Sequence, residues 1–382
     1  MLKSVSSKFY FIFLISVVFH PAMSLGDMGP YPIIRASGNQ QNPAIHNNIV
    51  VCEDYSSGES NISIADISNL SNIQHQAIDD SFSEARNPAV YGDIVVWEEK
   101  FFLYEDYDII GYNLRTDTSF PIFMSFADER YPSIYGNIVV AQVKLEGYSD
   151  YDIFGADISR PDNQNIFGVD ASSMEQQRPD VFGNIVVYQD NYLGDWDISG
   201  VDISNPDEPD WFSVFSRFEQ QQMPAVSGNW VVCEDNISGA WDISGDNIFH
   251  PLSGEVLAAD ENSDSQNADI CNNIVVWQDK RNGNWDIYGL NLTTKDSFQI
   301  TSNSANQTCP AISFNTAVGG YMVVWQDYRN ENWDIYGKVL DGPNVAGSAS
   351  PLKWDINADG IVDEVDVDEV QAHEGQQNGV PY

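Results

Sequence analysis

Runs of β-branched and aromatic residues recur along the chain at a nearly constant spacing. The stretch from Ile274 to Leu292 shows the unit most clearly, because an apolar run (IVVWQD) is followed by turn residues (KRNGN) and a second extended run (WDIYGLNL). Asn-Gly between two such runs is typical of a tight hairpin. The first run does not alternate with polar residues, so we expect neighbouring layers to cover both of its faces.

Seven copies of this unit follow one another at intervals of 44 to 48 residues. Their apolar triplets begin at Ile49, Ile94, Ile138, Ile185, Trp230, Ile274 and Met322. A segment before each triplet, such as NPAVYGD (87–93), predicts a short inner strand, and a segment after the second run, such as SFQITSN (297–303), predicts an outer strand. The period and the four strands per copy predict an all-β fold, a seven-bladed β-propeller of four-stranded antiparallel blades.

The two ends of the repeat array complement each other. After Leu340 the last copy has no strand-like fourth segment, whereas PIIRASGNQQNPAI (32–45) matches the passage from a fourth strand into the next blade, QITSNSANQTCPAI (299–312). We therefore expect the amino-terminal strand to complete the last blade. Such a closure leaves no unpaired blade edge.

The repeat resembles that of the TolB-type β-propellers. The resemblance rests on VVWQDKRNGNWDIYGLNL (275–292) and covers roughly Tyr31 to Leu340. That family includes periplasmic partner-binding proteins, surface-layer proteins and the regulatory propellers of some peptidases. The resemblance therefore implies a fold and leaves the function open.

The amino-terminal residues are typical of a secretory signal peptide. Lys3 and Lys8 precede an apolar core at 9–19, and small residues at Ala22 and Ser24 fit a cleavage site. A membrane anchor is the alternative, but the apolar core is shorter than the roughly 20 residues that span a bilayer. We expect a secreted, extracellular or cell-surface protein, with the periplasm also open, and no transmembrane segment after cleavage.

The chain is strongly acidic, and this excludes one class of partner. Its formal net charge is −40, which moves to −42 when Lys3 and Lys8 leave with the signal peptide. Such a surface repels phosphate backbones, so we expect no nucleic-acid partner. The acidity otherwise indicates a solvated surface or attraction of cations. The four cysteines suggest neither a disulfide framework nor a zinc site.

Two sets of residues recur around the predicted ring. Aspartates follow the first run and open the second in most copies, and we interpret them as acceptors for turn amides, a metal or substrate ring being the alternative. The loops that enter the inner strands instead vary in chemistry from copy to copy. We predict that side chains there bind a ligand at one mouth of the central channel, solvated loop residues being the alternative: Gln41, Arg86, Arg130, Gln177, Gln222 and Gln266.

The sequence contains no common catalytic motif. There is no GxSxG, no HExxH and no Gly-rich phosphate loop. A metal-dependent lyase, such as one resembling the seven-bladed oligogalacturonate lyases, would need clustered histidines. We assign His46, His75 and His250 to three different blades and His373 to the tail. A glycosidase with paired carboxylates stays open, because carboxylates are abundant.

The carboxy-terminal residues have the pattern of a calcium loop. Twelve residues, DINADGIVDEVD, place oxygen ligands at the required spacing with Gly360 at the turn, the predicted ligands being Asp355, Asn357, Asp359, the carbonyl of Ile361, Asp363 and Asp366. Asp at the last position and the lack of a preceding helix resemble one half of a dockerin module. The resemblance implies a cohesin-like scaffold as a partner, although the second loop of such a module is missing.

We therefore predict a signal peptide (1–24), a propeller (25–342), a linker (343–354) and a dockerin-like, EF-hand-like calcium segment with a short helix (355–382). As function we predict a non-catalytic binding or scaffold protein that presents its channel mouth to a protein or glycan ligand. The first alternative is an extracellular polysaccharide-active enzyme, either a lyase or a glycosidase. A surface-layer structural protein is the second alternative.

If the loop binds calcium, titration calorimetry of the full chain with CaCl₂ will show a site that is lost in an Asp355→Ala, Asp359→Ala double variant. The reason is that each change removes a carboxylate ligand. A wild-type protein that gives no calcium signal would refute the assignment.

Overall fold

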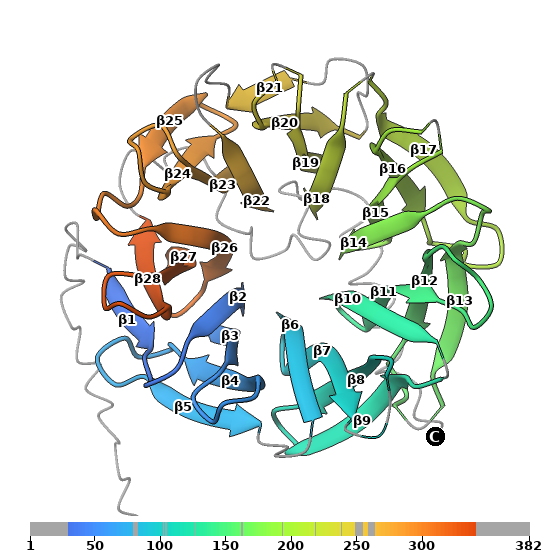
Figure 1. The fold of residues 1–382 in the computed structure, drawn as a ribbon, viewed down its shortest axis with the longest axis horizontal. Helices are drawn as coiled ribbons and strands as arrows, with labels where there is room; N and C mark the ends of the chain where they lie inside the picture. The colour runs from blue at the N-terminus through green and yellow to red at the C-terminus, as the bar shows by residue number, and fades with distance from the viewer. Residues whose placement is uncertain are drawn as a thin grey trace, which may run out of the picture.

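The computed structural model describes residues 30–340 except 79–82, 102, 104, 126, 162, 193, 218, 238, 249–254 and 259–263. Seven four-stranded antiparallel sheets surround a central channel, which confirms the predicted propeller (Figure 1). The predicted signal peptide and the calcium segment with its six ligands lie outside the described residues. Among the described residues, no helix has the length and apolar character needed to cross a bilayer.

Each blade contributes one strand to each of four concentric positions. The inner strands are β2 (Gln40–His46), β6 (Ser83–Tyr91), β10 (Asp128–Tyr135), β14 (Gln176–Phe182), β18 (Gln221–Ser227), β22 (Ser265–Cys271) and β26 (Gln307–Asn315). The second strands are β3 (Ile49–Asp54), β7 (Ile94–Phe101), β11 (Ile138–Lys144), β15 (Ile185–Asp190), β19 (Trp230–Asp235), β23 (Ile274–Asp279) and β27 (Gly320–Asp327).

The third strands are β4 (Asn61–Asp66), β8 (Asp108–Asn113), β12 (Asp152–Asp157), β16 (Asp197–Asp202), β20 (Asp242–Asn247), β24 (Asp286–Asn291) and β28 (Asp334–Leu340). The outer strands are β5 (Gln74–Ile78), β9 (Thr118–Phe123), β13 (Asn165–Asp170), β17 (Asp210–Phe215), β21 (Glu255–Ala258), β25 (Asp296–Gln299) and β1 (Tyr31–Ile34). Blades 1 to 7 are numbered from the blade that begins with β2.

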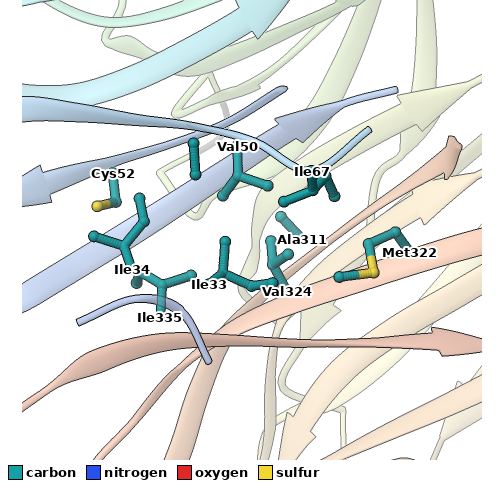
Figure 2. Close-up of a cluster of buried hydrophobic side chains, with 10 residues drawn as sticks. Ile33, Ile34, Val50, Cys52, Ile67, Ala311, Met322, Val324 and Ile335 are labelled. Atoms are coloured by element: carbon teal, nitrogen blue, oxygen red, sulfur yellow. The ribbon is translucent and has the colours of Figure 1, made fainter. Parts of the chain in front are cut away.

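The amino-terminal strand closes the ring as predicted. β1 pairs with β28 in blade 7, and the chain then passes directly into blade 1. Ile33 and Ile34 are buried between the two blades, against Val50 of blade 1 and Val324 and Ile335 of blade 7 (Figure 2). The burial of this apolar area stabilises the junction at roughly 25 cal/mol per Å².

The apolar triplets form the layers between the blades. In β23, all six residues from Ile274 to Asp279 are buried, which confirms that both faces of this strand are covered. All four cysteines are free.

Each inner strand carries a β-bulge with one residue in the left-handed conformation. These residues have φ between +47° and +54° and are Asn42, Asn87, Tyr131, Arg178, Met223, Asn267 and Cys309. A non-glycine residue with positive φ is unusual and costs free energy, so an interaction must hold it in place.

Buried Glu or Gln side chains supply that interaction. Each lies on the second strand of the preceding blade and accepts the backbone N–H of the left-handed residue at 2.6 to 3.1 Å; the acceptors are Gln326, Glu53, Glu98, Gln142, Gln189, Glu234 and Gln278, in blade order of their donors. Every blade is therefore bonded to the next, and Gln326 bonds blade 7 to Asn42 of blade 1. We call this the inter-blade ring.

The inter-blade ring generates a stability prediction. In Gln278→Leu, the buried amide of Cys309 loses its acceptor, so we expect the free energy of unfolding to fall by about 1–3 kcal/mol in urea denaturation. Gln278→Glu keeps an acceptor of the kind that Glu53 provides in blade 1, so its free energy of unfolding should fall less. Equal losses in the two variants would contradict the assigned role.

Candidate functional site

The six residues predicted to bind a ligand lie at equivalent positions of six inner strands. Each is on an inner strand, one residue before the left-handed residue, and is half-buried: Gln41, Arg86, Arg130, Gln177, Gln222 and Gln266. Several of their side chains engage the residue two positions earlier. Arg86 pairs with Glu84, Arg130 pairs with Asp128 at 2.9 Å, and Gln177 donates to Glu175 at 2.7 Å.

The channel cavity itself is lined by the residues that follow these six. It has a volume of about 360 Å³ and is bordered by the left-handed residues and the two residues after each, the first of which is a proline in every blade except blade 6, where it is Ala268. Asp180 and Asp269 stand where most blades have a small residue, and burial raises the pKa of both carboxyls. The ligand-binding role of the six residues stays a prediction.

The histidines lie differently from our expectation. His46 and His75 are both in blade 1, not in different blades, and they line one cavity of about 540 Å³. The sequence assignment was wrong because the first copy is degenerate and its outer strand was not recognised. Among the described residues, no group of three or more His, Cys, Asp or Glu side chains is arranged to hold a metal ion.

The repeated aspartates of the second strands have the structural role that we expected. In blades 1, 4, 6 and 7, Asp54, Asp190, Asp279 and Asp327 each accept a backbone N–H two residues on, at 2.9 to 3.1 Å. The aspartates that begin the third strands depart from this pattern. Asp286, for example, accepts side-chain amides of Asn282, Asn284 and Gln299.

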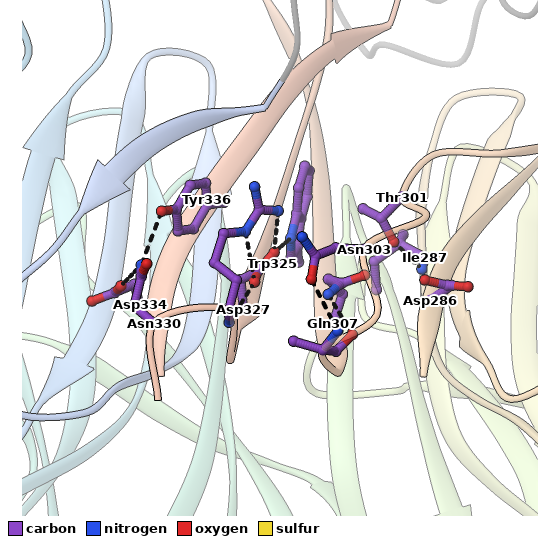
Figure 3. A network of polar contacts seen from close by, with 12 residues as sticks. Asp286, Ile287, Thr301, Asn303, Gln307, Trp325, Asp327, Asn330, Asp334 and Tyr336 are labelled. Carbon is purple, nitrogen blue, oxygen red and sulfur yellow. Dashed lines mark hydrogen bonds and ion pairs between the residues drawn. The ribbon is translucent and has the colours of Figure 1, made fainter. Parts of the chain in front are cut away.

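In blades 6 and 7, an arginine of the following turn pairs with the aspartate that ends the second strand. Arg281 binds Asp279 through two nitrogens at 2.8 and 2.5 Å, and Arg329 binds Asp327 in the same way at 2.9 and 2.5 Å. Each guanidinium also lies over a tyrosine ring. In blade 7 this is the ring of Tyr336. Figure 3 shows Asp327 held from one side by Trp325, with Asp334 and Asn330 next to Tyr336.

Blade 4 keeps the aspartates but lacks the arginine. Tyr192 occupies the position of Arg281, two residues after Asp190, and Ser199 occupies the position of Tyr288, two residues after Asp197. The place that a guanidinium and a phenol ring fill in blade 6 is therefore open. Among the described residues, Asp190 forms no ion pair, and it accepts from Ser199 Oγ and the N–H of Tyr192.

An acidic cleft of about 350 Å³ results at the junction of blades 3 and 4. Its lining is Asp170, Ser172, Gln176, Tyr188, Asp190, Tyr192, Asp197, Ser199, Trp211, Phe212, Ser213 and Ser216. Because Gln176 at the start of β14 pairs with Asp190 at the end of β15, the cleft lies on the face where the inner strands begin. Trp211 and Tyr192 are 55% and 67% exposed.

Two carboxyl groups of the cleft face each other across neighbouring strands. Asp190 and Asp197 are cross-strand partners, and their side chains are only 7% and 6% exposed. Burial and the charges of Asp195 and Asp190 raise the pKa of Asp197 to about 6. Asp170 completes the group from β13 and accepts the hydroxyl of Tyr188 at 2.7 Å and the N–H of Ser172 at 3.0 Å.

Sequence reasoning missed this cleft because it treated a residue repeated in every blade as part of the blade. The signal that could have revealed it was a difference between copies. KRNGN in blade 6 aligns with NYLGD in blade 4, where a second carboxylate, Asp195, takes the place of Asn284. Together the residues form a cleft with paired carboxylates, one of them easily protonated, beside two exposed aromatic rings.

No protein-family model and no curated protein match the chain. Solved structures do match. A prolyl endopeptidase aligns with a TM-score of 0.61 at 8% identity, over 78% of this chain and 46% of that one. The oligogalacturonate lyase of Vibrio parahaemolyticus aligns with a TM-score of 0.59 at 11% identity, over 83% of this chain and 94% of that one. TolB from Acinetobacter baumannii aligns with a TM-score of 0.48 at 14% identity, over 72% and 66%.

These matches support the fold and correct the function that we predicted. The chain spans about half the length of the prolyl endopeptidase. Puromycin-hydrolysing and acylaminoacyl peptidases also match, so the matched propellers belong mainly to enzymes. The prediction of a non-catalytic binding or scaffold protein is therefore wrong, and the alternative of an enzyme is better supported. We had left a glycosidase with paired carboxylates open, but the search for linear motifs gave it no support.

The raised pKa of Asp197 generates a stability prediction. A carboxyl whose pKa is raised on folding stabilises the protein at low pH, and this contribution is lost as the pH rises through about 6. Asp197→Asn stays neutral, so we expect it to raise the free energy of unfolding by about 1–2 kcal/mol at about pH 8 and to change it little at about pH 4.

Denaturant titration at both pH values checks this. Asp54→Asn is the control, because we expect it to change the free energy of unfolding in the opposite direction. Although burial opposes the effect, hydrogen bonds from Ser56, Ser63 and Gln40 lower the pKa of Asp54. Asp54→Asn should therefore destabilise the protein at neutral pH and do so less as the pH falls. If the free energies of unfolding of the two variants changed with pH in the same direction, the raised pKa of Asp197 would be contradicted.

Proposed function

We propose that the protein is a polysaccharide-active enzyme that hydrolyses a glycosidic bond in the acidic cleft. The observation that carries the proposal is the pair Asp190 and Asp197, which lines a cleft in blade 4 where blades 6 and 7 place an arginine. Glycoside cleavage needs two carboxyl groups, one protonated and one ionised. Trp211 and Tyr192 provide apolar faces on which sugar rings can stack.

The structural matches support the architecture of such an enzyme. The matched oligogalacturonate lyase is covered over 94% of its length, so in that protein little lies outside the propeller. The peptidases that match are covered over 46% to 59% of theirs. A cleft formed within the propeller itself fits the first arrangement.

The two carboxyl groups would divide the chemistry between them. Asp197, whose pKa is about 6, donates a proton to the glycosidic oxygen as the bond to the anomeric carbon breaks. Asp190 attacks that carbon, and water activated by Asp197 then hydrolyses the glycosyl ester and returns the proton. Because Asp190 and Asp197 are cross-strand partners, both carboxyl groups can act on the same glycosidic bond.

Hydrolysis suits this cleft better than elimination. A lyase acting on uronic acid polymers must neutralise the substrate carboxylate before a proton can be removed from the adjacent carbon. Asp170, Asp190 and Asp197 would repel such a group, and no arginine or lysine of the described part of the chain lines the cleft. The glycosidic transition state instead carries positive charge, which a carboxylate stabilises.

We further propose that the enzyme acts outside the cytoplasm and that its tail binds calcium. The support is the leader pattern at 1–24 and the ligand spacing from Asp355 to Asp366. A partner of the cohesin kind would attach through that tail.

Reducing-end assays on a panel of polysaccharides test the proposed activity. We expect Asp190→Asn and Asp197→Asn to lower kcat/KM by about 10²–10⁴-fold, because each removes one of the two reacting groups. Wild-type kcat/KM should also decline above about pH 6, as Asp197 loses its proton. Asp286→Asn, at the matching position of blade 6, should keep full activity. Activity that survives both cleft variants would rule out this site.

A further inference from the structure

The acidic cleft has the features of a site for a positively charged group. The counterpart of its Asp190 binds the guanidinium of Arg281 in blade 6 and that of Arg329 in blade 7. In blade 5, Arg217 reaches from the preceding connection and contacts Asp235 at 2.7 Å. Three neighbouring blades thus supply a cation at this position from their own sequence.

Blade 4 supplies none. Asp170, Asp190 and Asp197 line the cleft without an ion pair among the described residues, and no lysine or arginine borders it. Burial and the charges of Asp195 and Asp190 raise the pKa of Asp197, and a cation in the cleft would offset the repulsion between these carboxylates.

A separate observation comes from Gln176. Its side chain is only 1% exposed and borders the cleft, and its Nε2 donates to Ser172 Oγ at 2.8 Å. Its Oε1 has no hydrogen-bond partner among the described residues. A buried oxygen without a donor costs about 1–3 kcal/mol, so this atom calls for a ligand that donates hydrogen bonds.

We propose that the sugar polymer bound in the acidic cleft carries free amino groups, held as ammonium ions by Asp170 and the Oε1 of Gln176. This rests on the proposed function for the identity of the ligand as a polysaccharide. An ammonium group has three donors and no acceptor, which matches a cleft that offers acceptors and no free cation. Exposed Trp211 and Tyr192 add faces that attract a cation.

The charge of the whole molecule favours the same substrate. A net charge of −40 repels polyuronates and attracts a cationic polymer over a distance of about a Debye length. Binding should therefore weaken as salt is added.

Three β-1,4-linked oligosaccharides of equal length test the inference, since they differ only in the group on carbon 2: glucosamine (ammonium), N-acetylglucosamine (neutral amide) and glucose (hydroxyl). At mildly acid pH, where the amino groups are charged, we expect titration calorimetry to show the glucosamine oligomer binding the wild type at least about tenfold more tightly than the other two. Asp170→Asn should remove most of that preference.

Tyr192→Arg is the most specific variant. It places in blade 4 the arginine that blades 6 and 7 already have, so the guanidinium should form an ion pair with Asp190. We expect this to abolish binding of the glucosamine oligomer and to raise Tm. Ile237→Arg is the matched control at the same position of blade 5, where Arg217 already contacts Asp235. It should bind the oligomer as the wild type does.

The outcomes separate this inference from the proposed function. Equal binding of the three oligomers, or binding of none, overturns the inference. Selective binding that depends on Asp170, without cleavage of any oligomer, supports the inference and overturns the proposed hydrolysis. Cleavage that depends on Asp190 and Asp197 but favours a neutral oligomer supports hydrolysis and overturns the inference.

Discussion

One hydrogen bond, repeated seven times, connects the blades to one another. A buried Glu or Gln of each blade accepts the N–H of a left-handed residue in the next, and the last of these bonds returns to the first blade. Stacked sheets held only by apolar contact could slide or splay, because apolar burial has no preferred direction. A directional bond near the axis fixes the distance and rotation between blades, and it compensates for backbone that would otherwise be strained.

With the frame held near the axis, the face of the molecule is free to vary. The turns between the second and third strands contribute no residue to the inter-blade ring, so a side chain there can differ between blades without breaking the ring. Blade 4 has Tyr192 and Ser199 where blade 6 has Arg281 and Tyr288, and a cleft lies where blade 6 has an ion pair. The consequence is a site with two acids in place and no arginine beside them. Burial and the charges of Asp195 and Asp190 raise the pKa of Asp197, and functional sites often carry such shifts at some expense of stability.

The sequence was sufficient to predict the period, the strands of each blade and the closure by the amino-terminal strand. These depend on local patterns of apolar residues and turns, which recur in the sequence. It was not sufficient for the inter-blade ring, because the Glu or Gln of VVWQD looked like one more polar residue at the end of a strand. The cleft was missed for a related reason. Its meaning lies in a difference between blade 4 and the two blades that have an arginine at this position, and a search for what the copies share discards such a difference.

The inter-blade ring uses the main chain of the residue that borders the channel, and it makes no demand on that residue's side chain. This explains how Asn42, Tyr131, Arg178, Met223 and Cys309 can occupy equivalent positions despite their different chemistry. Assembly and surface chemistry are therefore specified by different atoms of one residue. The side chains that border the channel can therefore differ from blade to blade, while the blades remain hydrogen-bonded to one another.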